Sequence, residues 1–590
     1  MKLTLSKTLL IILFLFFQMN TFFLTAQNWS YGTLHEKKFI VDVGSIGNHV
    51  FFYSGGKRVG GVGVYTNEVE IYDVRTGTRE VFTLSPGQIR REMAIVASGS
   101  KIFFAGGYYN TLSEPNVIFD RVDIYDTLTG QWTVDHLSQG RYFLAAAAAN
   151  GTVMFGGGQG ATTPIVAERI VNRYDVNTQI WKDTTWLQST NLRAELAAAS
   201  VGDKVIFAGG SYSSMARDFV NIYDTKQHRW LPNATLSQKK TRLKSVVYDN
   251  NVYFVGGTVN GYSIPSDTID VYDDATESWS TMKIPHLFKA IKTGALRRYA
   301  RAAQAGCKMF LLPISDVSSS TPYNPLESSR DSVAVYDFAR GQWSYLALPK
   351  PVLSTVIVAA ENKVYFAGGY ELETLVATDL ISILTLQPKL QSTVETAVVT
   401  NYNFGNVLQG EEKAITVDFS NEGDYELLFA DLTTRVSISG DADQFNIDYS
   451  SLQANDTLSP AQILSLPLTF NPTSNGLKQV TITIHSNDPD QPIYSFTVRG
   501  TGTDVTPVQD AAFSNSLQVY PNPTTGLLHV ASKTQEPLYI EVLNTQGTRM
   551  KETQYISNNE AVDLSSLAEG LYFLKIANAT SSAVVKVIKK

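Results

Sequence analysis

A tryptophan-containing segment recurs along this 590-residue chain at an interval of 49 residues. In each copy a Tyr-Asp pair begins seven residues before the Trp. Four copies read almost alike: RVDIYDTLTGQW (121–132), VNRYDVNTQIW (171–181), FVNIYDTKQHRW (219–230) and TIDVYDDATESW (268–279). A fifth copy, VAVYDFARGQW, ends at Trp343 after a longer insertion. A period of this size indicates a repeat architecture, in which each unit buries its apolar face only against its neighbours.

Each unit divides into four short strands. The first strand consists of small residues, as in LAAAAA (144–149), and the second usually ends in Gly-Gly, as in VMFGGG (153–158). Small side chains suit an innermost strand, because a radial array crowds toward its axis. Paired glycines allow the positive φ and the close backbone approach that a sharp exit from a strand needs. The pattern therefore predicts an all-β, radially repeated region.

Double Gly, then Tyr-Asp, then Trp at this spacing resembles the kelch repeat, over residues 27–386. The resemblance implies a β-propeller, and we count seven units. The first unit has Arg79 where Trp is expected, and in the sixth unit MFLLPIS (309–315) replaces the Gly-Gly strand end. No Tyr-Asp-Trp segment follows Gly368–Gly369 in the seventh unit.

The missing outer strand of the seventh unit has a candidate at the N-terminus. The segment NWSYGTL (28–34) reads much like QWSYLAL (342–348). We therefore expect Trp29 to begin the outer strand of the seventh blade, which closes the ring and removes an open sheet edge. Six blades remain the alternative, if the degenerate sixth unit is only a long loop.

Two smaller domains are expected after the propeller, each preceded by a polar linker, at 387–395 and 503–516. The segment 396–503 alternates apolar and polar residues between regular turns, which predicts a β-sandwich. Its stretches FGNV, SNEG and FNPTSNG resemble the immunoglobulin-like domains of the abnormal-spindle and hydin type. Bacterial domains of this kind often precede a surface anchor. A spacer without a ligand is the favoured interpretation.

Residues 517–590 begin with YPNP and continue with NTQG, LAEGLYFLKI and a basic end. Because proline cannot donate to a β-ladder, the two prolines are expected to fix the entry to a small sandwich. This order of motifs resembles the C-terminal sorting domain of the type IX secretion system of Bacteroidetes. The resemblance implies an export address and the secretion machinery as a partner. It rests on Tyr520, Pro521, Asn522, Pro523, Gly526, Gly547 and Gly570.

The N-terminus predicts a secretory signal peptide over residues 1–26. Lys2 and Lys7 precede the apolar run LLIILFLFF (9–17), and LTAQ (24–27) offers a cleavage site after Ala26. An N-terminal membrane anchor is the alternative, but this apolar run is short for a bilayer. No later stretch reaches transmembrane length. We therefore expect a secreted or outer-surface protein that passes through the periplasm.

Composition excludes some classes of function. The formal net charge of −7 gives no reason to expect nucleic-acid binding. The single cysteine, Cys307, excludes an intramolecular disulfide and lies in an apolar segment, so we interpret it as a core residue.

A basic residue precedes the innermost strand in five of the seven units, at the same distance from the Gly-Gly pair. Such a ring is expected to face the mouth of the central channel, where its charge would attract an anion or a sugar. The alternative is a structural role, in which each base binds loop carbonyls. The ring consists of Arg90, Arg141, Arg193, Lys240 and Arg297.

Enzymatic chemistry has less support in the sequence. Some kelch-type propellers resemble copper-radical oxidases or sialic-acid mutarotases, and the oxidases need a cross-linked Cys and paired His ligands. The histidines here are scattered, and no catalytic carboxylate pair, Walker loop or zinc motif is evident. We therefore predict a glycan- or protein-binding module with no catalytic residue, metal or cofactor. A sugar mutarotase or oxidase-like enzyme remains the alternative, and clustered polar groups with perturbed pKa values in the channel mouth would favour it.

Overall fold

The structure is a computed structural model. It describes residues 28–59, 62–64, 66–84, 89–109, 117–160, 167–188, 192–259, 264–285, 299–314, 332–350, 352–353, 355–371, 376–395, 397–398, 400–430, 435–450, 457–504, 511–533, 536–551, 554–556, 559–578 and 581–590. The expected signal peptide (1–26) and Arg297 lie outside these residues. The all-β fold class expected from the sequence is confirmed, with α3 (Ala511–Ser516) as the one α-helix among the described residues.

Seven antiparallel sheets follow one another in the described part of residues 28–385, each with four main strands. We number them as blades one to seven in chain order. From the inner to the outer strand they are β2, β3, β5 and β6 (Phe39–Ile46, His49–Val59, Glu68–Asp73, Arg79–Thr83); β7, β8, β11 and β12 (Ala94–Ser98, Lys101–Ala105, Arg121–Asp126, Gln131–His136); β14, β15, β17 and β18 (Ala145–Ala149, Thr152–Gly156, Ile170–Asp175, Ile180–Trp186); β19, β20, β22 and β24 (Ala197–Val201, Lys204–Ala208, Met215–Asp224, Ala234–Lys240); β25, β26, β29 and β30 (Lys244–Tyr248, Asn251–Val255, Thr268–Asp273, Ser278–Lys283); β31, β32, β33 and β34 (Tyr299–Ala305, Lys308–Ile314, Ser332–Asp337, Gln342–Ala347); and β36, β37, β39 and β1 (Val356–Ala360, Lys363–Ala367, Leu380–Thr385, Asn28–Thr33).

Short strands extend several loops of these blades. In blade four, β21 (Ser211–Tyr212) and β23 (Arg229–Trp230) also pair with β22, and in blade one β4 (Val62–Val64) pairs with β3. Separate two-strand ribbons are β9 with β10 (Tyr108–Tyr109, Val117–Ile118), β13 with β16 (Arg141–Tyr142, Gln159–Gly160), β27 with β28 (Thr258–Val259, Ile264–Pro265) and β35 with β38 (Val352–Leu353, Tyr370–Glu371).

The constant Tyr-to-Trp spacing is explained by the register of the outer hairpin. Tyr125 lies directly opposite Trp132, and their rings lie 5.1 Å apart between centroids. Tyr174 and Trp181 repeat this pairing in blade three, also at 5.1 Å. Each Trp thus packs on the Tyr of its own blade, so any change in loop length would break an aromatic contact.

The N-terminal strand completes blade seven. β1 runs antiparallel to β39, with Trp29 opposite Leu384, and the Trp29 ring lies 5.8 Å from that of Phe366. This pairing confirms the expectation that the N-terminus supplies the missing outer strand. The inner strand β36 contacts both β31 of blade six and β2 of blade one, so the last blade packs against the first.

Blade one departs from the repeat at the position where it meets the closing strand. Arg79, which stands in place of Trp, donates from Nη1 to the carbonyl oxygen of Thr33 in β1 at 2.6 Å. On the same side of the ring, Arg75 forms an ion pair with Glu361 of blade seven at 2.6 Å. Lys363 Nζ donates to the Val74 carbonyl at 3.0 Å. Polar contacts therefore hold the closing strand where the other blades use an indole.

The second domain is a β-sandwich. Its sheets are β41-β40-β43-β48-β46 and β42-β50-β49-β45, with a β44–β47 ribbon. The strands are β40 (Leu390–Val394), β41 (Ala397–Val398), β42 (Asn401–Leu408), β43 (Lys413–Asn421), β44 (Leu427–Leu428), β45 (Val436–Gly440), β46 (Phe445–Ile447), β47 (Thr457–Leu458), β48 (Ile463–Phe470), β49 (Gly476–His485) and β50 (Ile493–Thr503).

The expected linker 387–395 is not a linker, because β40 lies within it. Leu390 and Val394 point into the sandwich core on alternate positions, and the intervening residues are polar. The sandwich therefore begins at Leu390 rather than at Thr396. The error arose because a five-residue strand with only two apolar residues resembles a polar connection.

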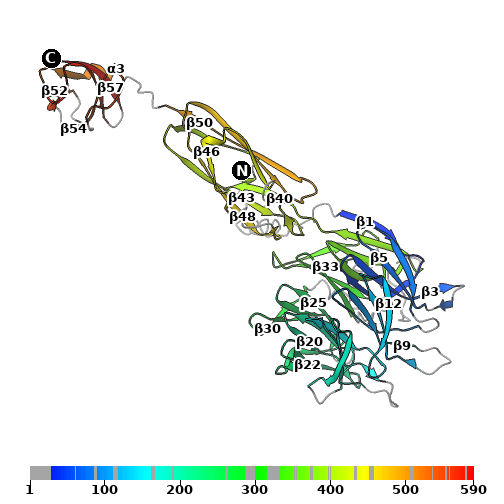
Figure 1. The fold of residues 1–590 in the computed structure, drawn as a ribbon. Helices are drawn as coiled ribbons and strands as arrows, with labels where there is room; N and C mark the ends of the chain where they lie inside the picture. Colours follow the sequence, from blue (N-terminus) through cyan, green and yellow to red (C-terminus); the bar gives the residue numbers. More distant parts are fainter. Residues whose placement is uncertain are drawn as a thin grey trace, which may run out of the picture.

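The sandwich packs directly against the base of blade six, as Figure 1 shows. Lys308 Nζ lies 2.9 Å from Asp337 in the same blade and 3.1 Å from Asp424 of the sandwich. A Cβ added to Gly306 would lie 2.5 Å from the Asp424 carbonyl oxygen, so the two backbones approach closely there. Ion pairing and close packing thus join the propeller and the sandwich without a spacer.

The C-terminal domain contains α3 and two small sheets, β51-β52-β55 and β54-β53-β56-β57. The strands are β51 (Leu517–Tyr520), β52 (Leu527–Ser532), β53 (Leu538–Leu543), β54 (Gln554–Ile556), β55 (Glu560–Asp563), β56 (Gly570–Ala577) and β57 (Ser582–Lys589). Phe513 of α3 is buried in this core, so the domain begins at Ala511, inside the expected linker 503–516.

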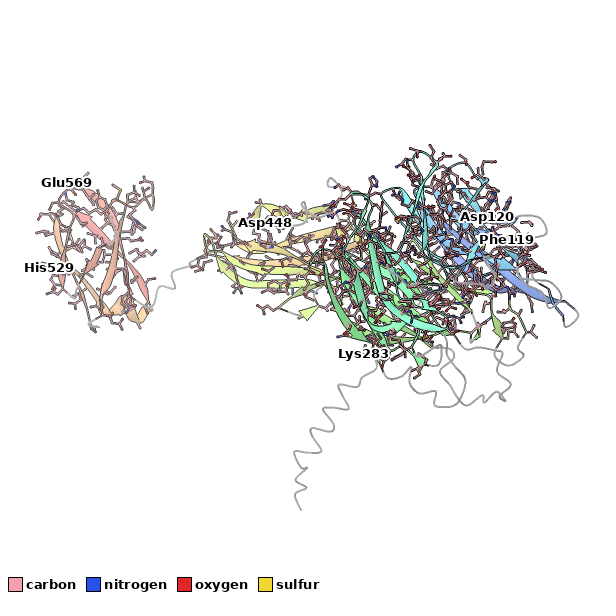
Figure 2. The ribbon with its side chains drawn as sticks, turned by 90° about the horizontal axis from the view of Figure 1, so that it is seen from below. Phe119, Asp120, Lys283, Asp448, His529 and Glu569 are labelled. Carbon is pink, nitrogen blue, oxygen red and sulfur yellow. The ribbon has the colours of Figure 1, made fainter. Side chains whose placement is uncertain are left out.

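The C-terminal domain lies apart from the rest of the molecule. In Figure 2, His529 and Glu569 mark it at one end, Asp448 marks the sandwich, and Asp120 and Lys283 mark the propeller. No helix among the described residues is long and apolar enough to cross a membrane.

Deleting residues 27–36 removes β1 and should expose the edge of β39. We expect the truncated protein to aggregate or to lose cooperative unfolding in a calorimetric scan. A milder pair of variants tests the same contact. Trp29→Ala should lower the free energy of unfolding by about 1–3 kcal/mol, whereas Tyr31→Ala, at a side chain that is 55% exposed, should change it little. An unchanged melting profile for the deletion would contradict closure by β1.

Candidate functional site

The predicted basic ring is buried in the structure. Arg90, Arg141, Arg193 and Lys240 each have 0% exposed surface, and Arg297 lies outside the described residues. These four side chains therefore do not face the channel mouth.

Each of these bases instead links two neighbouring blades. The backbone carbonyl of Arg141 accepts a hydrogen bond from Gly107 of blade two at 2.8 Å. The Arg141 side chain donates from Nη1 to the Gly157 and Ile170 carbonyls of blade three at 2.7 and 2.8 Å. Its Nη2 donates to Asn172 in the third strand of blade three. One residue thus connects the loop of one blade with the Gly-Gly segment of the next.

The same arrangement recurs around the ring. Arg193 binds the Gly209 and Phe219 carbonyls at 2.9 and 2.6 Å and donates to Asn221. Arg90 pairs with Asp123, and Lys240 pairs with Asp270 at 2.5 Å. The acceptors always lie two residues before the Tyr of the Tyr-Asp pair. They are Asp123, Asn172, Asn221 and Asp270.

The glycine pair is required by this linkage. A Cβ at Gly157 would lie 2.6 Å from the Arg193 carbonyl oxygen, and Gly157 has a φ of +65°. The next residue, Gly158, donates to that same carbonyl at 2.9 Å. A side chain here would therefore push the next blade away.

Blade one contains a further member that the sequence reasoning missed. Lys38 is fully buried, and its Nζ lies 3.4 Å from Glu70, the residue two before Tyr72. A register irregularity between β2 and β3 places this base one residue further from the Gly-Gly pair than the bases of the predicted ring. The polar residue two positions before each Tyr is the signal that could have revealed the buried pairs.

These observations correct the expected function of the four described bases. Burial lowers the pKa of Arg141 to about 10 and that of Arg193 to about 9, because desolvation disfavours the charged form. Their hydrogen-bonding groups contact backbone carbonyls and third-strand side chains. They hold blades together, as the structural alternative states, and offer no free charge to a ligand.

The residues at the channel mouth lie two positions further along each loop. Glu92, Phe143, Glu195 and Arg242 all have φ values between +55° and +57°. Phe143 N donates to the Glu92 carbonyl at 3.1 Å, and Glu195 N donates to the Phe143 carbonyl at 2.9 Å. Arg242 N donates to the Glu195 carbonyl at 2.9 Å. A chain of backbone hydrogen bonds, which we call the mouth ring, therefore crosses blades two to five.

The side chains of the mouth ring form a polar cluster. Arg242 Nε donates to Glu195 Oε1 at 2.5 Å, and the other Glu195 oxygen accepts from the Thr241 and Ser211 hydroxyls at 2.9 and 3.0 Å. The Arg242 guanidinium also lies 5.6 Å from the centre of the Phe143 ring. Glu195 thus fixes the guanidinium, which covers an aromatic face beside it.

Three charged residues lie on inner strands at the same end of the channel. Lys244 and Arg301 occupy the inner-strand position at which blades two, three and four have alanine. Each residue at this position pairs with the second-strand residue that directly precedes the Gly-Gly position. Asp42 lies in β2 of blade one. A charged residue within an otherwise small, apolar strand, as in YARAA and LKSVV, indicates a side chain that faces the channel. This signal was present in the sequence but was missed.

Electrostatics couple these groups. Burial, and next the neighbouring Asp42 carboxylate, raise the pKa of Glu92 to about 7 against the opposing effect of Lys244 and Arg242. Burial also raises the pKa of Asp42, opposed by Lys244 and Arg301. Asp42 Oδ2 and Arg301 Nη1 are buried atoms without a hydrogen-bond partner among the described residues. The channel mouth therefore holds perturbed carboxyl groups next to fixed cations.

Aromatic side chains border this cluster on one side. The rings of Tyr108 and Tyr142 lie 4.5 Å apart, and that of Phe143 lies 5.1 Å from Tyr142. The Arg91 guanidinium lies 5.2 Å from the Tyr108 ring centre. Within the described ranges, no group of three or more His, Cys, Asp or Glu side chains could hold a metal ion.

The YPNP segment of the tail is bound along the last strand. β51 ends at Tyr520, directly before Pro521, and Tyr520 OH donates to Asn559 Oδ1 at 2.7 Å. Asn522 donates from Nδ2 to the Lys586 carbonyl at 2.7 Å and accepts from Ile588 N at 3.0 Å. Asn522 therefore substitutes for a strand residue beside β57, which ties the start of the domain to its C-terminus.

Of the three tail glycines, Gly526 alone occupies a tight position. Gly526 has a φ of +154°, and a Cβ there would lie 2.5 Å from Ser565 Oγ. Gly547 has a φ of +81° in the turn after β53, and Gly570 begins β56.

Family models match three parts of the chain. The Secretion system C-terminal sorting domain matches residues 518–590, the HYDIN/CFA65/VesB-like, Ig-like domain matches residues 397–501, and the Kelch motif matches residues 89–134 and 240–284. The chain combines kelch motifs, a HYDIN-type Ig-like domain and a C-terminal sorting domain. These three resemblances were expected from the sequence and are confirmed.

Curated relatives match the kelch region. The chain is 27% identical over 125 residues to an F-box/kelch-repeat protein of Arabidopsis thaliana, which covers 21% of this chain and 27% of that protein. It is 24% identical over 254 residues to Kelch-like protein 25 of Xenopus tropicalis, over 40% of this chain and 39% of that protein. It is 24% identical over 131 residues to Kelch-like protein 38 of Danio rerio, over 22% and 21%. The chain therefore spans well under two thirds of the length of these kelch proteins.

Arg141→Ala should destabilise the propeller, because it leaves two buried carbonyls and Asn172 without their donor. We expect the free energy of unfolding to fall by on the order of 3 kcal/mol, measured by denaturant titration. Arg141→Lys should lose less, since Lys240 fills the same position in blade five. The exposed Arg229 provides the control, and Arg229→Ala should change stability by no more than about 0.5 kcal/mol. Equal stability of Arg141→Ala and the native protein would contradict the linking role.

Proposed function

We propose that this exported kelch protein binds a glycan at the mouth ring of its propeller. The observation that carries the proposal is the polar cluster of Glu92, Glu195, Arg242, Lys244 and Arg301 beside Phe143. Sugar hydroxyls both donate and accept hydrogen bonds, so carboxylates and guanidinium groups placed side by side suit them. The aromatic residues next to the cluster offer an apolar surface for the carbon-bound hydrogens of a sugar ring.

A polar ligand fits this site better than a simple anion does. Three carboxyl groups, at Asp42, Glu92 and Glu195, lie among three cations. The positive charge that would attract an anion is therefore largely balanced within the cluster. A protein loop with polar side chains is the other ligand class that this mouth would accept, and a protein-array experiment separates it from a glycan.

An enzyme acting on a sugar is the second candidate. It is favoured by the pKa of about 7 at Glu92, because a general acid or base works best near the ambient pH. Interconversion of sugar anomers breaks and re-forms the bond between C1 and the ring oxygen while a proton moves from the C1 hydroxyl to the ring oxygen and back. The reaction is redox-neutral, so an acid–base group can catalyse it without a metal or cofactor. NMR exchange spectroscopy on a reducing sugar, with Glu92→Gln as the comparison, distinguishes this activity from binding alone.

The sorting domain points to secretion or cell-surface export. We propose that a signal peptide over residues 1–26 directs the chain to the periplasm, from which the type IX secretion machinery exports it through its tail. We further propose that the tail is removed within residues 503–516 during export. The separate core of the tail, with α3 and its own two sheets, supports a domain that is read and cut independently.

Lys244→Ala should remove a charge from the mouth without removing a buried contact, because Lys244 is exposed to the channel. On a glycan array, we expect the variant of the full-length protein to lose at least tenfold in affinity for the glycans that the native protein binds. Lys239→Ala, which removes the same charge from an exposed position on the outer strand β24, is the control. Unchanged glycan binding by Lys244→Ala at an unchanged melting temperature would contradict the proposed site.

Deleting residues 511–590 should leave a folded propeller and sandwich inside the cell envelope, because domains with separate cores share few contacts. Fractionation should find this variant in the periplasm, and the intact mass of the native surface form should end within 503–516. A fusion of the tail and the signal peptide to an unrelated folded reporter should carry the reporter to the surface. Normal surface yield of the deletion, or a surface form that ends at Lys590, would contradict the export model.

A further inference from the structure

A cavity lies at the end of the propeller opposite the mouth ring. Its volume is about 620 Å³, within the range of small-molecule sites. Turns and strand ends of blades one, five, six and seven form one wall, and the Ig-like domain forms the other with Tyr425, Glu426, Ser459 and Pro460. The cavity exists only because the sandwich packs against the propeller.

Several polar groups that line this cavity have no partner among the residues that the structure describes. The Glu426 carboxylate forms no hydrogen bond or ion pair with any described residue, and the same holds for the hydroxyl groups of Tyr248 and Tyr425. Gln304, by contrast, donates to the Gly306 carbonyl at 2.6 Å, and Glu361 pairs with Arg75. The free groups therefore belong to both walls of the cavity.

The charge lining the cavity is negative. No lysine or arginine is among the lining residues, whereas Glu361 and Glu426 are. Burial raises the pKa of Tyr425, and the carboxylates of Glu426 and Glu361 raise it further. Burial likewise raises the pKa of Tyr248, with contributions from the charges of Cys307, Asp249, Asp337 and Glu426. Because Arg75 neutralises Glu361, the net charge that a ligand would meet comes from Glu426.

We propose that this cavity binds a small organic cation, with its ammonium group against Glu426 and beside the ring of Tyr425. A carboxylate next to the Tyr425 ring suits a cation, because a carboxylate and an aromatic ring both attract positive charge. An anion would find no complementary side chain on either wall. The cavity is large enough for an amino sugar or a short amine.

The junction between the two domains keeps the walls of the cavity in place. Lys308 bridges Asp337 and Asp424 at 2.9 and 3.1 Å, directly next to Gly306 and Cys307 in the lining. Cys307 is 2% exposed, and its Sγ lies 3.8 Å from the Asp424 carbonyl oxygen. The Ig-like domain is therefore a structural part of a binding site as well as a connection to the tail, unlike the spacer expected from the sequence.

Titration calorimetry on the full-length protein tests this site with choline and glucosamine as cations, glucose as the neutral control and glucuronate as the anionic control. We expect both cations to bind, and glucose and glucuronate to bind at least tenfold more weakly. Glu426→Gln should weaken cation binding at least tenfold, whereas Glu412→Gln, an exposed glutamate elsewhere on the same domain, should leave it unchanged.

Three results would overturn the proposal: no binding of either cation, binding of glucose that equals choline binding in the Lys244→Ala variant, or unaltered choline binding by Glu426→Gln. The melting temperatures of both variants test whether a loss of cation binding comes from unfolding. Because the Glu426 side chain is exposed, we expect Glu426→Gln to leave the melting temperature unchanged. Lys244→Ala, which lies at the other end of the channel, should leave cation binding intact. This variant separates the cavity from the glycan site, so that either proposal can fail alone.

Discussion

The propeller depends on one repeated interaction, the buried base that joins neighbouring blades and is described in blades one to five. A guanidinium buried in protein is unfavourable unless its donors find acceptors. In Arg141 and Arg193, Nη1 donates to two backbone carbonyls and Nη2 to an asparagine, whereas Nε has no partner among the described residues. The backbone of the same residue accepts from the Gly-Gly pair of the preceding blade. A single residue therefore orients two neighbouring sheets. This explains why base, glycine pair and third-strand acceptor occur together in blades two to five.

The chemistry of the mouth follows from this linkage. Once the base is fixed, only three residues lead into the innermost strand, and the second of them adopts a left-handed conformation in four consecutive blades. That turn directs Glu92, Phe143, Glu195 and Arg242 to the channel end and aligns their backbone groups in a continuous chain of hydrogen bonds. The mouth is thus rigid in its backbone, and its specificity lies in the side chains that the loops carry. Preorganisation of this kind lowers the cost of binding.

The sequence predicted the parts of the fold that depend on spacing. The Tyr-to-Trp interval is a hairpin register, and the resemblance of residues 28–34 to 342–348 revealed the closing strand, because both follow from local backbone geometry. Whether the Arg141 side chain is buried or faces the channel could not be predicted in this way, because its burial depends on contacts with the next blade. Lys38 was missed because a register irregularity moves it out of phase. Lys244 and Arg301 were missed because they stand at positions where the repeat pattern breaks, and the prediction used only the repeated positions. The cavity beside Glu426 could not be predicted, because it forms between two domains and no single segment of the sequence determines their packing.

Hydrogen exchange of the backbone amides of Phe143, Glu195 and Arg242, followed by mass spectrometry, tests most directly whether the blades are joined at the mouth as described. Loops at the end of a propeller ordinarily exchange quickly, because their amides are open to water. The account predicts that these three amides exchange as slowly as those of the inner strands, and that Arg141→Ala accelerates exchange at Phe143 first. Exchange as fast as in the exposed turn around Leu128, in the native protein, would contradict the account.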